Sequence, residues 1–285
     1  MNVNENLEEQ PGVDEVRDFW EESPLFSGES DNEVGSKDFF FEHRKIYMEE
    51  CFGGSFDERF LPKNKDKENA KILDLGCGIG FWVTEFGLFD YKNLYAADLT
   101  KTALNLTEKR LSLYGIEAEL SQENAEKTNF NDNFFDHVNC QGVIHHTPDT
   151  EAAVKEIHRI LKSGGSASIS VYYKNFFLRN WRFLSVMGYI LNKFGSGLKG
   201  RGRENIYLQK DVNEIVRLYD GDENPIGKSY SKKEFLQLLK GSFEIDETYL
   251  HFFPTRSLPF KIPKIFQKIL DKYFGFMIYA SLTKK

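Results

Sequence analysis

A glycine-rich segment, Leu73-Asp74-Leu75-Gly76-Cys77-Gly78-Ile79-Gly80, has the composition of a nucleotide-binding turn. Glycines allow the backbone to turn sharply and to approach a ligand closely, and a helix that begins directly after them presents free N–H groups. The glycines follow the order G-x-G-x-G, whereas the dinucleotide fingerprint is G-x-G-x-x-G. The segment therefore favours a nucleoside ligand over a nicotinamide dinucleotide.

A second acidic residue, Asp98, ends the next short apolar run, in the order Ala97-Asp98-Leu99. A carboxylate at the end of the second strand of such a unit can accept hydrogen bonds from both ribose hydroxyls of a nucleoside. Asp98 would serve a nicotinamide cofactor equally well, so this residue alone does not separate the two classes of ligand.

Two histidines, His145 and His146, follow a later apolar run. An imidazole titrates near neutral pH, so either side chain is a candidate general base. Tyr172 and Tyr173 end another run and are candidates for lining a substrate pocket. Each pair also has a structural interpretation: the histidines could cap local structure, and the tyrosines could pack in the core.

The elements that would position these residues alternate regularly along the chain. Short apolar runs at 71–75, 94–97, 118–121, 136–141 and 166–173 predict strands, and the patterns at 81–89, 101–114 and 150–161 predict helices. A helix at 231–239 and strands at 243–253 and 275–283 follow. This alternation predicts an α/β fold, a doubly wound, mostly parallel Rossmann-like sheet with helices on both faces.

Residues 174–230 interrupt the pattern after the fifth strand. They are rich in aromatic and basic residues, with helical spacing at 174–194 and 204–219 and a glycine-rich basic hinge at 195–203. Ligands of open α/β sheets bind beyond the carboxyl ends of the strands, so an insertion at this place predicts a helical lid. Arg179, Trp181 and Tyr219 are candidates for substrate contacts from this lid.

Residues Leu73 to Tyr173 resemble the core of a class I S-adenosylmethionine-dependent methyltransferase. The resemblance is closest to the small-molecule group that includes the ubiquinone and menaquinone methyltransferases. Besides the glycine segment and Asp98, it rests on four motifs: Asn124-Ala125-Glu126-Lys127, Asn133-Phe134-Phe135-Asp136, Gly142-Val143-Ile144-His145-His146-Thr147-Pro148, and the stretch from Glu156 to Gly165.

The resemblance implies S-adenosyl-L-methionine as cofactor and S-adenosyl-L-homocysteine as product. It places Asp98 on the ribose, Leu99 against the adenine, and Asp74 at the methionyl ammonium. Asn124 stands where the family usually has Asp and keeps an oxygen acceptor for the adenine amino group. The other positions implied to bind the cofactor are Gly76, Gly78, Gly80, Ala125 and Gln141. A histidine pair recurs in members with different acceptors, which favours a structural role for His145 and His146.

Four parts are predicted: an acidic N-terminal arm and helix at 1–69, the S-adenosylmethionine-binding core at 70–173, the basic and aromatic lid at 174–230, and the C-terminal part of the α/β core at 231–285. The acidic composition of residues 1–35 is typical of a mobile arm. That arm also holds Phe19, Trp20 and Phe26, which could either dock on the core or close over a ligand.

Composition narrows the function classes. The 285 residues carry a net charge of −7, with 40% hydrophobic and 28% charged residues, and contain no apolar run near the ~18 residues that cross a bilayer. No signal-peptide pattern opens the sequence, so we expect a cytoplasmic protein. The three cysteines lack metal-type spacing, which predicts neither disulfides nor a metal site. A long nucleic acid is a poor partner for so acidic a chain.

The expected function is methyl transfer to a small-molecule acceptor, either hydrophobic or anionic. RNA or protein methylation, and a non-catalytic cofactor-binding protein of the same fold, remain alternatives. The basic, aromatic stretches at 174–194 and 259–276 are compatible with peripheral contact to an anionic membrane surface or with a homodimer.

Overall fold

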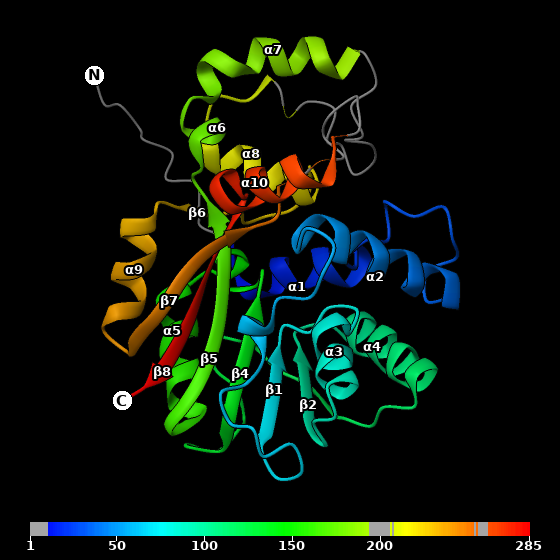
Figure 1. Ribbon diagram of the computed structural model, residues 1–285, viewed down its shortest axis with the longest axis vertical. Coiled ribbons are helices and arrows are strands. Elements are labelled where there is room, and N and C mark those ends of the chain that lie inside the picture. The colour runs from blue at the N-terminus through cyan, green and yellow to red at the C-terminus, as the bar shows by residue number, and fades with distance from the viewer. Residues whose placement is uncertain (1–10, 194–205, 207, 254, 256–261) are drawn as a thin grey trace, which may run out of the picture.

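One mixed β-sheet forms the centre of the molecule (Figure 1). The computed structural model describes residues 11–193, 206, 208–253, 255 and 262–285. The strand order is β3-β2-β1-β4-β5-β8-β7, with the short β6 paired to β5. The strands are β1 (Lys71–Leu75), β2 (Asn93–Asp98), β3 (Glu119–Gln122), β4 (Phe135–Gln141), β5 (Leu161–Tyr173), β6 (Ser229–Tyr230), β7 (Phe243–His251) and β8 (Met277–Lys284).

The parallel part of the sheet is doubly wound, as predicted. Strands β1 to β6 pair in parallel, whereas β8 is antiparallel to both β5 and β7. The chain runs outward from β1 through β2 to β3 and then crosses back to form β4 on the other side of β1. The topological switch point, where ligands of such sheets bind, therefore lies between β1 and β4.

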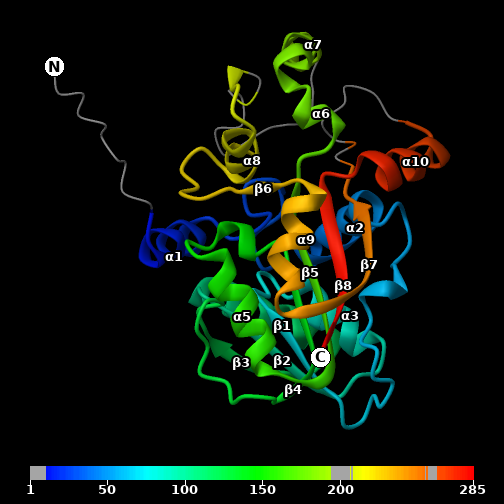
Figure 2. The same ribbon diagram turned by 90° about the vertical axis from the view of Figure 1, so that its left-hand side faces the viewer.

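Helices cover both faces of the sheet (Figure 2). They are α1 (Val13–Glu22), α2 (Lys37–Cys51), α3 (Phe81–Leu88), α4 (Lys101–Tyr114), α5 (Thr150–Ile160), α6 (Phe176–Arg179), α7 (Trp181–Lys193), α8 (Val212–Asp220), α9 (Lys232–Lys240) and α10 (Lys264–Phe274), with short 3₁₀ turns η1 (Glu58–Phe60) and η2 (Ile144–His146). None of these described helices is long and apolar enough to cross a membrane.

The continuous apolar run of β1 is explained by burial on both faces. Ile72 joins a core cluster with residues of α3, whereas Leu73 and Leu75 join the opposite cluster with residues of α5 and α9. A strand in this position has no solvent face, so an alternating polar pattern is absent from it.

The N-terminal arm docks on the core where the structure describes it, which is one of the two alternatives that its aromatic residues left open. Helix α1 packs across the start of α4, and the carboxylate of Glu21 accepts hydrogen bonds from the N–H groups of Lys101 and Thr102. Val16 and Phe26 are buried, so apolar contacts hold the arm as well. Residues 1–10 of the predicted arm lie outside the described residues.

The insertion forms a helical layer beyond the carboxyl ends of the parallel strands (Figures 1 and 2). Helices α6, α7 and α8 and strand β6 belong to it. Helix α8 begins at Val212, several residues later than the predicted start at 204, because Asp211 caps it by accepting hydrogen bonds from the N–H groups of Asn213 and Glu214. The predicted hinge at 195–203 lies outside the described residues.

Candidate active site

The glycine segment forms a tight turn between β1 and α3. Gly76 has φ +73°, and a Cβ atom on it would lie 2.2 Å from Cγ2 of Val143. Gly78 has φ +54°. Positive φ values favour glycine, and the close approach of Val143 leaves no room for a side chain. Gly76 is therefore required by the turn itself.

Asp98 ties the glycine turn to the end of β2. Its Oδ2 atom accepts a hydrogen bond of 2.9 Å from the Gly78 N–H. Its Oδ1 atom accepts hydrogen bonds from the N–H of Thr100 at 3.0 Å and from the Thr100 hydroxyl at 2.9 Å. Burial raises the pKa of Asp98, although these hydrogen bonds act in the opposite direction. The carboxylate is thus held in one orientation beside the turn.

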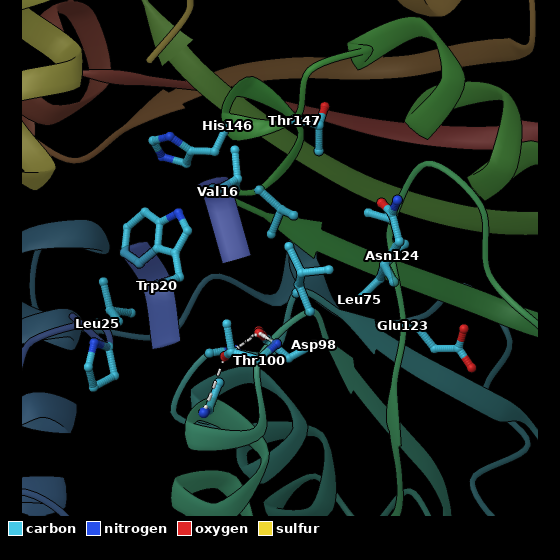
Figure 3. Close-up of a pocket in the computed structure, with 18 of the residues that line it drawn as sticks. Val16, Trp20, Leu25, Leu75, Asp98, Thr100, Glu123, Asn124, His146 and Thr147 are labelled. Atoms are coloured by element: carbon cyan, nitrogen blue, oxygen red, sulfur yellow. Dashed lines mark hydrogen bonds between the residues drawn. The ribbon is translucent and has the colours of Figure 1, made fainter. Parts of the chain in front are cut away.

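A first cavity opens at the carboxyl ends of β1, β2 and β4 and encloses about 840 Å³, including its open mouth. Figure 3 shows Asn124 on one side of it, Trp20 and His146 on the other, and Asp98 and Thr100 between them. The lining residues are Val16, Trp20, Pro24, Leu25, Leu75, Gly76, Gly78, Asp98, Leu99, Thr100, Ala103, Glu123, Asn124, Ala125, Gln141, Gly142, Val143, His146 and Thr147.

Most of the residues predicted to bind the cofactor meet at this cavity: Gly76, Gly78, Asp98, Leu99, Asn124, Ala125 and Gln141. Asn124 also accepts a hydrogen bond from the Glu126 N–H. Gly80 is not among the lining residues; it is the N-cap of α3 with φ +75°. Its predicted contact with the cofactor stays a prediction.

Asp74 lies beneath the turn, outside the lining of the first cavity. It is buried and accepts hydrogen bonds from Asn139 at 2.8 Å and from the Val83 N–H at 3.1 Å. Burial raises the pKa of Asp74 to about 7. The polar residue Asn139 of β4 is therefore a satisfied core group, and the contact of Asp74 with a methionyl ammonium stays a prediction.

A second cavity adjoins the first. Five residues line both: Trp20, Leu25, Gln141, Gly142 and His146. The remaining walls of the second cavity are Phe26, Glu29, His43, Ile46, Tyr47, Tyr172, Tyr219, Asp220, Phe252 and Met277. Aromatic side chains from α1, α2, β5, α8 and the loop after β7 thus surround it.

The two predicted histidines occupy different environments. His146 lies where the cavities meet; its Nδ1 atom is 2.6 Å from the carbonyl oxygen of Ile226, and its Nε2 atom is 3.3 Å from Oδ2 of Asp220. His145 is fully buried and lines neither cavity. Burial lowers the pKa of His145 well below its usual value, so this ring is neutral.

Of the five residues predicted to contact the substrate, two line a cavity and three do not. Tyr172 and Tyr219 line the second cavity, whereas Tyr173, Arg179 and Trp181 line neither of the two. Arg179 donates a hydrogen bond to the Tyr173 hydroxyl at 3.0 Å, and Trp181 donates one to the carbonyl oxygen of Gln209.

Several lining residues escaped the sequence prediction because they come from distant segments. His43 and Tyr47 belong to a helix without a recognisable motif, and Phe252 follows β7. Trp20 stands out in the sequence only as one of three aromatic residues in an acidic arm. That excess of aromatic residues was the one available signal.

The chemistry of the lining fits the expected cofactor. Gly76 and Gly78 keep the backbone open, Asp98 presents an oriented carboxylate, and Oε1 of Gln141 is buried without a hydrogen-bond partner among the described residues. An unpartnered buried acceptor is costly, so a donor such as a ligand ammonium would satisfy it.

Comparison with known proteins identifies the domain. Residues 73–169 match the family described as methyltransferase domain. The demethylmenaquinone methyltransferase of Bacillus velezensis is 28% identical over 164 residues, which cover 54% of this chain and 70% of that protein. The sterol 24-C-methyltransferase erg6 of Aspergillus fumigatus is 33% identical over 101 residues, covering 35% of this chain and only 27% of that protein.

Solved structures share the fold. A methyltransferase of Haloferax volcanii, solved in complex with the Trm112 methyltransferase activator, superposes with a TM-score of 0.57 at 14% identity over 94% of this chain and 97% of that chain. A SAM-dependent methyltransferase of Thermotoga maritima gives 0.53 at 19% identity, over 87% and 94%. The domain match shows that residues 73–169 form a methyltransferase domain, and together with the curated relatives and the shared fold it supports a class I S-adenosylmethionine-dependent methyltransferase that resembles the quinone methyltransferases.

Proposed function

We propose that this chain transfers a methyl group from S-adenosylmethionine, held in the first cavity, to a small molecule held in the second. The observation that carries the proposal is the shared wall of five residues between the two cavities. Methyl transfer needs the nucleophile and the methyl carbon to meet in line at near-attack distance, and two adjoining cavities with a common wall provide such a meeting point.

The residues of the first cavity would hold the cofactor. Asp98 would accept hydrogen bonds from the ribose, Leu99 and Ala125 would contact the adenine, and Gln141 would accept from the ammonium. S-adenosylmethionine supplies a methyl group already activated by its sulfonium. The protein therefore has to position the acceptor and exclude water.

The second cavity favours an apolar acceptor. Trp20, Tyr47, Tyr219 and Phe252 contribute aromatic surface to it. The quinone and sterol substrates in the names of two relatives agree with an apolar small molecule. An anionic acceptor has less support, because Arg179 of the lid, one of the basic residues that suggested it, bonds Tyr173 outside the cavity.

The first test is calorimetric titration of the folded protein with S-adenosylmethionine, S-adenosylhomocysteine and NADH. We expect both sulfur nucleosides to bind and NADH not to bind. Asp98→Ala should weaken S-adenosylhomocysteine binding by at least about 100-fold, because two charge-assisted hydrogen bonds of ~1.5–3 kcal/mol each are lost. Absence of nucleoside binding by the wild-type protein would remove the proposal.

Acceptor class is then tested with methyl-labelled S-adenosylmethionine. We expect label in apolar small molecules. Label found only in added RNA or protein would favour methylation of a macromolecule, and tight nucleoside binding with no transfer to any of the three would favour a non-catalytic protein.

We also propose that α7 and α10 rest on an anionic membrane surface. Phe183 and Val186 of α7 are 82% and 65% exposed, and Ile265 of α10 is 69% exposed. The exposed charges on both helices are basic: Arg182 and Lys193 on α7, and Lys264, Lys268 and Lys272 on α10. Exposed apolar side chains flanked by cations are complementary to an anionic lipid surface, although the chain as a whole is acidic.

A further inference from the structure

We propose that the acceptor is a protic nucleophile, with a hydroxyl or an N–H group, and that His146 takes its proton while Asp220 and Tyr172 position His146. This inference rests on the proposed function. It adds two residues to the reaction, one of which, Asp220, comes from the inserted segment rather than from the parallel sheet.

The position of His146 is the first step of the argument. The nucleophile has to lie where the two cavities meet, since only there can it face both the acceptor site and the methyl group. Of the five described residues that line both cavities, His146 alone has an ionisable side chain. Within the shared wall, His146 is therefore the side chain that can take up a proton leaving the nucleophile.

The orientation of the ring is the second step. A carbonyl oxygen can only accept a hydrogen bond, so the 2.6 Å contact with Ile226 requires the proton on Nδ1 of His146. The other nitrogen, Nε2, is then the one that takes up a proton. It lies 3.3 Å from Oδ2 of Asp220, so the imidazolium formed by protonation has a carboxylate beside it.

Tyr172 fixes that carboxylate. Its hydroxyl donates to Asp220, with the two carboxylate oxygens at 2.9 and 2.7 Å. All three side chains are buried or nearly so. Asp220 ends α8, which brings the carboxylate to His146 from the insertion, while Tyr172 reaches it from the end of β5.

The other charged or titratable groups around His146 do not replace Asp220. From η2, His145 is neutral because burial lowers its pKa, and its ring centroid is 4.2 Å from that of His146. Lys228 donates hydrogen bonds to the carbonyl oxygens of Thr147 and Pro148 at 2.8 Å each, so its ammonium is held on the backbone. From α1, the indole of Trp20 contacts the ring at its edge and carries no charge.

The proton balance is simple. The nucleophile loses its proton to Nε2 of His146, keeps the electron pair of that bond and uses it to form the new bond to the methyl carbon, while the electrons of the broken carbon–sulfur bond leave with the sulfur. The positive charge then lies on His146 beside Asp220, and solvent removes the proton after the product has left. A nucleophile that has no proton to lose gains nothing from this arrangement.

A direct test follows the His146 ring by NMR in the protein loaded with S-adenosylhomocysteine. We expect the Nδ1–H tautomer for the neutral ring. In Asp220→Asn single-turnover methyl transfer to a protic acceptor should slow by about tenfold or more while the affinity for S-adenosylhomocysteine is kept, because the imidazolium loses its counter-charge. Tyr173→Phe is the matched control, since Tyr173 adjoins Tyr172 but lines neither cavity, and it should transfer at the wild-type rate. Wild-type transfer in Asp220→Asn overturns the proposal.

The second readout uses the acceptor found by methyl labelling. Asp220→Asn and Tyr172→Phe should lower kcat more than they raise KM and should shift the acid limb of the pH profile, and Asp220→Glu should restore part of kcat. An acceptor without an exchangeable proton, or wild-type kcat in His146→Gln, overturns the inference. Absence of nucleoside binding by the wild-type protein would instead overturn the proposed function. Failure of the inference and failure of the proposed function are therefore distinguishable.

Discussion

The carboxylate of Glu21 accepts hydrogen bonds from both the backbone N–H and the hydroxyl of Thr102, at 3.0 and 2.8 Å. Through this contact α1 supplies the cap for the first turn of α4, where free N–H groups and the helix dipole favour an anion. The same helix places Trp20 and Val16 in the lining of the first cavity. The contact between Glu21 and α4 thus holds α1 beside the first cavity.

Glu21→Ala should therefore weaken the packing of α1 against α4 beside the first cavity. Loss of a helix cap costs about 1 kcal/mol, so we expect S-adenosylhomocysteine to dissociate about five times faster, measured by stopped-flow fluorescence of the tryptophans. Glu22→Ala is the control, because the Glu22 side chain is exposed and makes no hydrogen bond or ion pair with another described residue. Equal dissociation rates in the two variants would mean that Glu21 does not hold α1 over the ligand.

Gly76→Ala should destabilise the protein and abolish nucleoside binding. The new methyl group would lie 2.2 Å from Val143 in a backbone with φ +73°, so the turn has to move. We expect a loss of about 2–4 kcal/mol in the free energy of unfolding, from overpacking and backbone strain together.

Gly241→Ala provides the comparison for that measurement. Gly241 has φ −69°, and a Cβ atom there meets nothing within 4 Å. The stability of the Gly241→Ala protein in urea and its affinity for the nucleoside should stay near those of the wild type. If Gly76→Ala also behaves like the wild type, the close packing of the turn against Val143 is not required.

The stability of the fold should depend on the protonation of His251. Burial disfavours its charged form, but hydrogen bonds to Asp271 at 2.5 Å and Asp57 at 2.8 Å outweigh burial and raise the pKa of His251. The folded protein thus binds this proton more tightly than the unfolded chain. The resulting stabilisation is fully present below about pH 6.5, the ordinary value for histidine, and is lost as the pH rises through the higher folded-state pKa.

Urea denaturation at a series of pH values checks this expectation. His251→Gln should unfold more easily, by about 3 kcal/mol, because Asp57 and Asp271 lose a buried cationic partner. Its stability should also fall less than that of the wild type on the alkaline side. A wild-type stability that does not change above about pH 6.5 would contradict the assignment.

Vesicle sedimentation tests the proposed membrane surface. We expect the protein to sediment with vesicles of phosphatidylserine and phosphatidylcholine, but not with phosphatidylcholine alone, and to be released by salt. Phe183→Ser with Ile265→Ser should weaken binding at least tenfold, because apolar area that would enter the interface is removed.

Leu113→Ser on α4 is the matched control, because Leu113 is exposed but lies outside both proposed helices. It should bind vesicles as the wild type does. Concentration-dependent dimerisation that the double substitution removes, without vesicle binding, would assign the α7 and α10 surface to a second copy of the chain.

Most of the fold was predictable from local patterns. The strand at 71–75 and the helix at 101–114 coincide with β1 and α4 as observed, because apolar periodicity and glycine stops act over a few residues. The start of α8 was wrong, since the Asp211 cap and not the helical spacing decides it. For the arm, the sequence left docking and closure over a ligand as alternatives, because the contact of Glu21 with α4 is created only by spatial proximity.

By itself, the sequence determined the nucleoside-binding turn, because the conformations of Gly76 and Gly78 and the position of Asp98 follow from residues close together in the chain. Only the tertiary structure decided the second cavity. It placed His146 in the wall of both cavities and buried its neighbour His145, although the local sequence does not distinguish the two histidines. It also brought Trp20, Tyr172 and Asp220 together from three distant segments. Contacts across 48 and 126 positions of chain are set by how the helices pack on the sheet, and no local pattern encodes that packing.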